Sequence, residues 1–427
     1  MSESELKPAK KKFEYKWVII AAAFAMVFTC LGFCSSNKSL YLNAITAVQG
    51  IERSLFSIND SCRYITTAVV NLFFGTLISK FGARKMIGAG FLCLIASTLI
   101  YAFADNIFVF YIGGCLLGMG LSWCTTTMVG YVVNCWCKEH KGTIMGLVLA
   151  ANGLGGALAA QIVTPIIYGS DFGYRSAYLL VAIILAVVGT VVVVLFRDAP
   201  KENAGDVPKK KARATAWKGL TFEQAVRKPY FYTTALCIFC VGFALQGVNG
   251  VAGSHLKDVG LDSAFVATVM SIHSLVLAAS KFLTGIAYDK FGLRKTLIFC
   301  QAMAIVAFIS LALVAPNTSG MTLAVVYGVT SSFALPLETI MLPLIAGDVF
   351  GQASYAKMMG IIVSINTAGY AIGTPIANLV YDKCGTYAPI LFVLAGLMVV
   401  VAVVFQLNLN VVAKDKAALA AAEVQEQ

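Results

Sequence analysis

Charged side chains are scarce in this chain. Asp, Glu, Lys and Arg make up 12% of its 427 residues, hydrophobic residues make up 59%, and the mean hydropathy is +0.81. A soluble fold of this length needs a polar surface that such a composition cannot supply. The shortage of charge therefore excludes a soluble protein and predicts that lipid surrounds most of the chain.

Sequence patterns for a metal, a nucleotide or a cofactor are also lacking. Most of the twelve cysteines lie inside apolar stretches, where cysteine acts as a small hydrophobic residue. We therefore expect no metal at the Cys135/Cys137 and Cys237/Cys240 pairs. No Gly-rich loop ending in Lys-Ser or Lys-Thr is present to bind phosphates, and no cofactor is expected.

Long apolar segments are what the chain does contain. A stretch of about 18 apolar residues can cross a bilayer as a helix, because a helix pairs its own backbone polar groups. The first stretch follows five lysines and has no small-residue cleavage site, which predicts a membrane helix and not a removed signal peptide. Twelve spans are predicted, at residues 17–38, 59–79, 86–104, 107–131, 143–167, 175–197, 230–252, 264–288, 294–315, 320–346, 358–381 and 387–410.

Two short basic segments between predicted spans have nearly the same sequence, 210 residues apart. One copy contains Gly75, Lys80, Gly82, Arg84 and Lys85, and the other contains Gly285, Asp289, Lys290, Gly292, Arg294 and Lys295. Such a repeat indicates two homologous halves, a common architecture among secondary transporters. The predicted fold is an all-α membrane protein with twelve transmembrane helices in two pseudo-symmetric six-helix bundles.

The polar segment 198–228 separates the two sets of six spans. The predicted domains are an N-terminal bundle at 1–197, this cytoplasmic linker, and a C-terminal bundle at 229–427 with a short cytoplasmic tail. The linker is rich in lysine, which can also attract anionic lipid. Its last part, from Thr221 to Lys228, is predicted to form a short surface helix.

The distribution of Lys and Arg predicts the orientation. With both termini cytoplasmic, 25 of the 32 Lys and Arg lie on the cytoplasmic side and five lie outside. Cytoplasmic segments of membrane proteins carry the excess of these residues. The net charge of +11 is thus a topology signal that needs no nucleic-acid partner. The short loops favour a bacterial inner membrane protein, with a eukaryotic plasma membrane as the alternative, and we expect a monomer.

Small and amide residues also repeat between the halves. Gly32 matches Gly242, and the set Gly146, Asn152 and Gly155 matches the set Gly360, Asn366 and Gly369. Small residues let helices approach closely, and an Asn can bond across the interface. We interpret these positions as packing devices in preference to substrate contacts.

The two basic segments resemble the signature of the major facilitator superfamily between helices 2 and 3 and between helices 8 and 9. The second copy keeps the usual acidic residue, Asp289, whereas the first copy has Ser79 in its place. The resemblance implies that these segments make charge contacts that brace one gating state. The missing Asp predicts a weaker brace in the N-terminal half.

A narrower resemblance comes from two further segments. Residues 37–45, after Gly32-Phe33, are similar to a segment of monocarboxylate porters, and residues 221–231 resemble bacterial oxalate/formate and monocarboxylate porters. The likeness implies secondary active transport of a small organic anion by alternating access, most simply a monocarboxylate. The alternatives of proton symport and anion exchange stay open, as does an oxalate/formate-type dicarboxylate exchanger.

Lys281 is the leading candidate for substrate binding. It lies eight residues before Asp289 in the predicted eighth span, which is about 12 Å by helical rise. A cation at that depth costs about 2.5–3.5 kcal/mol, so we expect a wet cavity or a counter-charge beside it. In the resembling families an Arg at this place binds the substrate carboxylate; Lys keeps the charge without the two-pronged geometry. The alternative is a structural ion pair with Glu338.

Glu338 is the acidic residue predicted to lie deepest in a span. Proton-coupled monocarboxylate porters often carry an Asp one turn before the cation of helix 8, but this chain has Leu277 there. Glu338 is therefore the natural substitute for proton coupling, through an exchangeable pair with Lys281. The alternative is a purely structural acid.

Three further residues are candidates for the substrate site. Lys38 matches the helix 1 Lys of monocarboxylate porters, although it can also be an interfacial Lys. Arg63 follows Asp60 by three residues, so a local ion pair is the favoured interpretation. His273 lies two turns before Lys281, although a lone His on an apolar helix is more often structural. Hydroxyl groups for a carboxylate are available from Tyr131, Tyr327 and Tyr370.

Other function classes fit the sequence less well. Drug/proton antiporters usually show a Gly-Pro motif in the fifth span, whereas this chain has Asn152-Gly-Leu-Gly155-Gly156. A membrane enzyme needs a cluster of reactive groups at membrane depth, and only His273 and Glu338 are candidates. A receptor on the same fold usually carries a large soluble domain, which the linker and the tail are too short to form. We therefore predict a transporter and not an enzyme.

Overall fold

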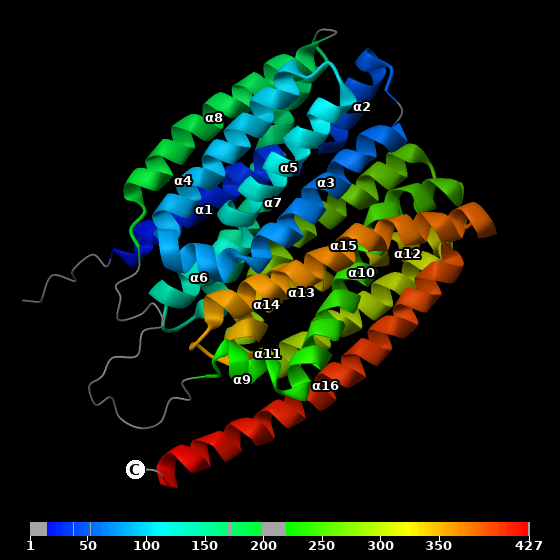
Figure 1. Cartoon of the computed structure of the whole chain (residues 1–427). Helices are drawn as coiled ribbons and strands as arrows, with labels where there is room; N and C mark the ends of the chain where they lie inside the picture. The colour runs from blue at the N-terminus through cyan, green and yellow to red at the C-terminus, as the bar shows by residue number, and fades with distance from the viewer. Residues whose placement is uncertain (1–14, 37, 52, 170–171, 199–218, 426–427) are drawn as a thin grey trace, which may run out of the picture.

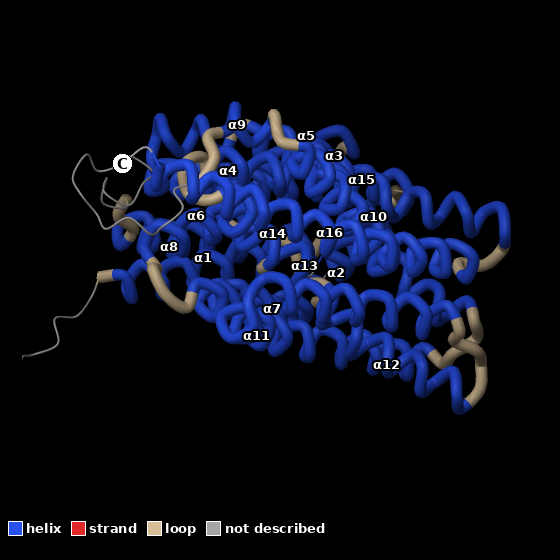
Figure 2. Tube along the Cα trace, turned by 90° about the horizontal axis from the view of Figure 1, so that it is seen from below, coloured by secondary structure: helices blue, strands red, loops and turns tan. Residues whose placement is uncertain are grey.

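The protein is a bundle of long helices. The computed structural model describes residues 15–36, 38–51, 53–169, 172–198 and 219–425, and within these ranges the β-structure is limited to one bridge, between Gly219 and Gly351. Figure 2 shows the helices side by side, with the loops gathered at the two ends. The helices are α1 (Lys16–Cys34), α2 (Lys38–Gln49), α3 (Arg53–Leu72), α4 (Phe74–Phe103), α5 (Ile107–Cys124), α6 (Thr126–Trp136), α7 (Lys141–Ile167), α8 (Gly173–Leu195), α9 (Phe222–Val226), α10 (Pro229–Asp258), α11 (Ser263–Ala312), α12 (Thr318–Ala334), α13 (Pro336–Thr339), α14 (Met341–Ile345), the π-helix η2 (Ala346–Phe350), α15 (Tyr355–Cys384) and α16 (Ala388–Gln425).

The twelve-helix prediction is confirmed. In the described residues, ten segments are long and apolar enough to cross a membrane, and the segment Ala264–Ala312 contains two helices that bend at Gly292. The remaining helix is α3, which is less apolar because it carries Asp60 and Arg63 on its length. Hydropathy alone undercounts this helix since part of its surface faces a cavity and not lipid.

The two basic segments have the same backbone geometry. Gly82 has φ 78° and ψ 163°, and Gly292 has φ 78° and ψ 173°. Glycine is the residue that adopts this region without strain. Arg84 donates to the Val193 carbonyl at 2.8 Å, and Arg294 donates to Gln406 Oε1 at 3.0 Å, so each segment is tied to the last helix of its own half. The sequence repeat is therefore a structural repeat.

Three elements differ from the sequence prediction. The helix α2 follows α1 after a break, because Tyr41, Ala44 and Ile45 form a buried stripe at helical spacing. The predicted span 320–346 is broken into α12, α13, α14 and η2, with Pro336 and Pro343 inside it. The helix α16 continues past residue 410, the predicted end of the last span, and ends at Gln425.

Polar contacts stabilise two elements that flank the C-terminal half, the extension of α16 and the short helix α9. The Asp415 carboxylate accepts from Lys228 Nζ at 2.7 Å and from the Tyr230 hydroxyl at 3.1 Å, which holds the extension of α16 against α10. The predicted short helix before helix 7 is present as α9. Its Thr221 cap bonds reciprocally with Gln224. Residues 199–218 of the predicted linker lie outside the described residues.

Figure 1 shows α1–α8 on one side of the molecule and α10–α16 on the other. The halves meet along two seams, α7 against α11 and α3 against α15. At the first seam Gly142 and Gly285 touch closely: a Cβ added to Gly142 would lie 2.5 Å from the Gly285 carbonyl oxygen. We call the end that holds residues 80–85 and 290–295 the basic end, and the other the opposite end.

Asn366 and Asn152 act in packing, as predicted. The Asn366 amide donates to the Ile238 carbonyl at 3.1 Å and thereby joins α15 to α10. Asn152 accepts from the Ser36 hydroxyl at 2.8 Å and joins α7 to the chain after α1. The two asparagines are equivalent in the repeat but bond to different partners, and in both halves a neutral hydrogen bond between neighbouring segments stabilises close packing.

Candidate functional site

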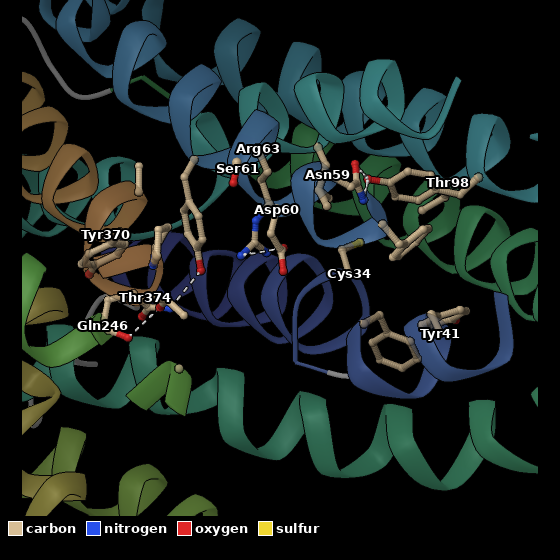
Figure 3. Close-up of a pocket in the computed structure, with 18 of the residues that line it drawn as sticks. Cys34, Tyr41, Asn59, Asp60, Ser61, Arg63, Thr98, Gln246, Tyr370 and Thr374 are labelled. Carbon is tan, nitrogen blue, oxygen red and sulfur yellow. Dashed lines mark hydrogen bonds and ion pairs between the residues drawn. The ribbon is translucent and has the colours of Figure 1, made fainter. Parts of the chain in front are cut away.

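A cavity of about 460 Å³ lies toward the opposite end, between the two halves. Its volume falls within the range typical of small-molecule sites. Figure 3 shows Arg63 and Asp60 in the middle of this cavity, Tyr370, Thr374 and Gln246 on one side, and Tyr41 on the other. The N-terminal half contributes α1, α2, α3, α4, α5 and α8 to the wall, and the C-terminal half contributes α10 and α15.

Arg63 is the cation of the cavity wall. Among the described residues that line the cavity, only Asp60 and Arg63 are charged. Arg63 is 5% exposed; its Nη1 donates to Ser35 Oγ at 2.9 Å and its Nη2 lies 3.4 Å from Asp60 Oδ1. Its guanidinium carbon lies 4.5 Å from the centre of the Tyr64 ring. The predicted local pair with Asp60 is present, and it stands in the cavity.

The ion pair leaves part of the guanidinium unused. Charge-assisted hydrogen bonds between N–H and carboxylate groups measure about 2.7–2.9 Å, so the 3.4 Å contact of Arg63 with Asp60 is loose. In the described part of the chain, the buried Arg63 Nε has no hydrogen-bond partner. The Arg63 Nε–H can therefore donate to one more anionic oxygen without first losing a strong contact.

The C-terminal half faces Arg63 with polar groups. The Tyr64 and Tyr370 rings meet edge to face across the halves, with centroids 5.8 Å apart. Gln246 Nε2 lies 3.5 Å from the Tyr64 hydroxyl, and the Thr374 hydroxyl donates to the Gln246 carbonyl at 3.1 Å. Of the three tyrosines that the sequence offered, Tyr370 is the one that lines the cavity.

Glu338 is buried directly behind Tyr370. Its carboxyl interacts with the Tyr370 hydroxyl, while its Oε1 has no hydrogen-bond partner within the described residues. Glu338 is 7% exposed and does not line the cavity itself. Tyr370 therefore contacts both the cavity and this carboxyl.

Lys281 lies at a seam and not in the cavity wall. It is 5% exposed, and its Nζ donates to the Leu149 carbonyl in α7 at 3.5 Å. No ion pair within 4.0 Å joins Lys281 to Glu338 in the ranges that the structure describes. The paired arrangement that the sequence suggested is therefore absent from this conformation.

His273 and Lys38 do not contribute described side chains to the cavity. His273 is buried between α11 and α12, with its Nδ1 2.9 Å from Ser331 Oγ and its ring stacked on Tyr327. This environment is that of a structural histidine. Lys38 begins α2, and its side chain lies outside the described residues.

The basic end is closed by contacts between the halves. Asp289 accepts from the backbone N–H groups of Gly142 at 2.9 Å and Thr143 at 2.7 Å, at the start of α7. Such capping joins a negative charge to the positive end of a helix. The Tyr355 hydroxyl also donates to the Gly130 carbonyl at 3.2 Å, from α15 to α6. The conformation thus has a closed basic end and a cavity at the other.

The two copies of the basic segment differ where the sequence differs. Ser79 donates to the Thr76 carbonyl of its own helix at 2.9 Å and so does not act as Asp289 does. The flanking Lys80 and Lys290 each stand over the next Phe ring, at 5.4 and 5.3 Å. Lys85 and Lys295 are exposed beside their arginines. The repeat is therefore complete except for its acidic brace.

Sequence reasoning missed the aromatic side of the cavity. Phe33, Tyr41 and Phe56 reach it from α1, α2 and α3, and Tyr101 and Tyr178 reach it from α4 and α8. These residues lie in five different helices, so no sequence spacing relates them. A signal for Asp60 and Arg63 was available, since both interrupt a predicted span.

Metal ligands are not gathered in the described part of the chain. His140 follows Cys137 by three residues, but no three His, Cys, Asp or Glu side chains there come close enough to hold a metal ion. The polar groups of the cavity are one guanidinium, one carboxylate, and hydroxyl and amide groups around them.

Comparisons with known proteins place this geometry in a family. The model described as Major Facilitator Superfamily matches residues 18–251 and again 234–425. The chain belongs to the major facilitator superfamily. The transporter FucP in its outward conformation has the same fold, with a TM-score of 0.72 over 92% of this chain and 99% of that chain at 13% identity. The proton:xylose symporter XylE matches with a TM-score of 0.71 over 91% of this chain and 94% of that chain, at 15% identity.

Relatives in this superfamily have varied substrates. The chain is 26% identical over 287 residues to the uncharacterized MFS-type transporter YcxA of Bacillus subtilis, a match that covers 66% of this chain and 67% of that protein. It is 23% identical to the sialic acid transporter NanX of Escherichia coli, over 60% of this chain and 61% of that protein. It is 25% identical to monocarboxylate transporter 13 of Rattus norvegicus, over 75% of this chain and 72% of that protein. The protein is therefore a multi-pass membrane transporter of small molecules.

Proposed function

We propose that this superfamily member transports a small organic anion, a monocarboxylate, by alternating access. The observation that carries the proposal is Arg63, a buried cation in a cavity between the two halves with a guanidinium nitrogen left unpaired among the described residues. A buried cation in a membrane transporter marks a substrate or ion site by default. The relatives named for monocarboxylate and for sialic acid support an acidic substrate.

The loose ion pair supplies the binding step. A substrate carboxylate at Arg63 competes with Asp60 and forms the two parallel hydrogen bonds that suit a guanidinium. The side chain of Asp60 is 34% exposed, so it can turn toward water when Arg63 is taken. A single carboxylate matches the single cation of the wall, which favours a monocarboxylate over a dicarboxylate.

Alternating access requires the two halves to part at one end of the seams and to close at the other. In the present conformation the basic end is closed and the cavity lies at the opposite end, which we assign to the outside by the distribution of Lys and Arg. Closing the cavity and parting α7 from α11 would release Lys281 from the Leu149 carbonyl. We propose that Lys281 then becomes the second cation available to the anion. The energy for transport comes either from a proton gradient or from the gradient of an exchanged anion.

Uptake into proteoliposomes tests the proposal. A labelled panel of formate, acetate, lactate, pyruvate, oxalate and succinate is offered with an imposed pH gradient, and separately with unlabelled anion inside. We expect saturable uptake of a monocarboxylate that falls about tenfold or more in Arg63→Gln, since hydrogen bonds to charged groups are worth about 1.5–3 kcal/mol. Arg63→Lys should keep part of the uptake, because it keeps the charge and loses the planar fork.

The matched control is Arg175→Gln. Arg175 also lies near the opposite end and also pairs with an Asp, but it does not line the cavity. Normal uptake in Arg63→Gln, or an equal loss in Arg175→Gln, would contradict the assignment of Arg63. Lys281→Met in the same assay tests the second cation, and unchanged transport in that variant would remove Lys281 from the mechanism. Preferred uptake of oxalate would favour the dicarboxylate exchanger instead.

A further inference from the structure

Five aromatic side chains of the N-terminal half line the cavity. The rings of Tyr41 and Tyr178 stack at 4.1 Å between centroids and 20° between planes, and Tyr101 lies 5.2 Å from Tyr178. Phe33 and Phe56 complete this wall. All five side chains are buried in the N-terminal half, and all five line the same cavity as Arg63 and Asp60. We call these five residues the aromatic wall.

The Tyr41 hydroxyl is the unused polar group of the aromatic wall. Tyr41 is 5% exposed, and its buried hydroxyl has no hydrogen-bond partner in the part of the chain that the structure describes. The Tyr101 hydroxyl, by contrast, bonds with Asn59 at 2.9 and 3.1 Å. An unpaired buried hydroxyl costs free energy, so a bound molecule with a polar atom at this place would gain by pairing with it.

Shape and polarity together point to a larger substrate than formate or acetate. A short carboxylate at Arg63 would leave much of the 460 Å³ cavity that the aromatic wall lines unfilled. A flat apolar tail would instead cover these rings, and aromatic pairs add attraction beyond the burial of apolar area. Ligand sites with this composition use apolar walls for affinity and a few polar groups for orientation. Arg63 and the Tyr41 hydroxyl are those groups here.

We infer that the substrate is an aromatic monocarboxylate whose ring lies on the aromatic wall, whose carboxylate binds Arg63, and whose ring hydroxyl pairs with the Tyr41 hydroxyl. The inference rests on the proposed function, because it assumes that an anion is transported through this cavity. It adds the chemical class of the substrate and one residue that determines specificity.

Competition for uptake in proteoliposomes is the first test. The probes are acetate, phenylacetate, 3-hydroxyphenylacetate, 4-hydroxyphenylacetate and the neutral phenylacetamide. We expect phenylacetate to inhibit or to be transported at concentrations at least tenfold lower than acetate, and phenylacetamide to be inactive at those concentrations. Equal or better action of acetate would overturn the inference. Equal action of phenylacetamide would also overturn it, because the carboxylate would then contribute nothing.

Tyr41→Phe tests the hydroxyl without changing the shape of the side chain. In the wild type we expect a hydroxylated ring to be preferred over phenylacetate, and in Tyr41→Phe we expect this preference to fall by about three- to tenfold, as for loss of one neutral hydrogen bond. The preference is a ratio of two uptake rates in the same variant, and a size-exclusion profile like that of the wild type shows that the variant is folded. The matched control is Tyr168→Phe, whose tyrosine is 57% exposed.

The outcomes separate this inference from the proposed function. If acetate or lactate is transported through an Arg63-dependent route while aromatic carboxylates are not, the inference fails and the proposed function stands. If no carboxylate is transported at all, both fail. An unchanged ring-hydroxyl preference in Tyr41→Phe overturns the role of Tyr41 alone.

Discussion

Glu338 and Tyr370 connect the cavity with the interior of the C-terminal half. Tyr370 lines the cavity beside Tyr64, and its hydroxyl interacts with the Glu338 carboxyl behind it. An acidic group at membrane depth typically marks a path for protons. If the gradient is one of protons, Glu338 is the residue in the described interior that is placed to take one from the cavity through Tyr370.

The first prediction at the residue scale therefore concerns Glu338→Gln. We expect this variant to lose uptake driven by a pH gradient by about tenfold or more, since Gln keeps the shape and cannot bind the proton. Exchange against internal unlabelled anion should remain within about threefold of wild type, because this mode needs no net proton movement. Both modes are measured in the same proteoliposomes.

Tyr370→Phe is the companion variant. It removes the hydroxyl between the cavity and Glu338 and should slow proton-driven uptake more than exchange. Tyr327→Phe is the control, because Tyr327 is a buried tyrosine stacked on His273, outside the cavity. Equal loss of both transport modes in Glu338→Gln would show that Glu338 is structural, which is the alternative that its burial also allows.

At the scale of elements, the N-termini of α7 and α15 make equivalent seams with unequal braces. Asp289 caps α7, whereas Ser79, at the matching place beside α15, bonds within its own helix. Gly75 nevertheless approaches Lys357 at the start of α15: a Cβ on Gly75 would lie 2.5 Å from the Lys357 Cα. An acidic side chain four residues after Gly75 would therefore reach the free N–H groups of that helix.

A reciprocal pair of variants tests this difference. Ser79→Asp should stabilise the conformation with the closed basic end, and Asp289→Ser should destabilise it, each by about 1 kcal/mol as for a helix cap. The equilibrium constant between this conformation and the alternative one should change by about fivefold. The reporter is Cys34, which is half-buried and lines the cavity, so its rate of modification by a small charged thiol reagent follows access to the cavity.

Cys34→Ser is the control for that assay, because the part of the modification that is lost in this variant is the part that occurs at Cys34. The double variant with Ser79→Asp and Asp289→Ser has a carboxylate cap at the start of α15 in place of the one at the start of α7. Its rate of Cys34 modification should therefore be near that of the wild type. Rates that change in the same direction for both single variants would contradict the assignment of Ser79 and Asp289 to one closed conformation.

At the scale of the whole molecule, the two bundles define one end that is closed and basic and another that holds the cavity. The compartment toward which the cavity lies in this conformation depends on which end faces the cytoplasm. The excess of Lys and Arg predicts that the basic end does. Cys384 lies at the opposite end, because it is the last residue of α15, and this helix begins at the basic end and crosses the bundle. Its accessibility therefore shows which side of the membrane the opposite end faces.

Labelling of Cys384 tests the orientation. Of the twelve cysteines, all in described residues, Cys384 is the exposed one. In intact cells we expect a membrane-impermeant maleimide to label the protein, and Cys384→Ser to lose most of that label. Labelling that requires permeabilised cells would place the basic end outside and would reverse the topology.

Much of the fold was predictable because local physical chemistry dictates it. The length of an apolar segment predicts a membrane span independently of the neighbouring helices. The repeated basic segments predicted a turn in each half, and these turns lie at Gly82 and Gly292. The breaks around Pro336, the helix α2 and the extension of α16 were not predicted. Each depends on contacts with other helices, such as the Asp415 contact with Lys228.

The site was predictable only in its chemistry. The sequence showed that a cation, an acid and tyrosines occur at membrane depth, and it ranked Lys281 above Arg63 on depth and resemblance. Depth along a helix says nothing about which neighbour a side chain faces. The structure places Lys281 against the Leu149 carbonyl at a seam and Arg63 in the cavity wall.

Sequence alone thus determined the class of the protein: a membrane transporter of twelve helices in two repeated halves, because hydropathy and repeats act locally along the chain. Tertiary structure decided which charges meet the cavity, and it assembled the aromatic wall from five helices. It also decided which end is closed, since that depends on how the two halves pack. These features arise from contacts between distant segments, which no single stretch of sequence contains.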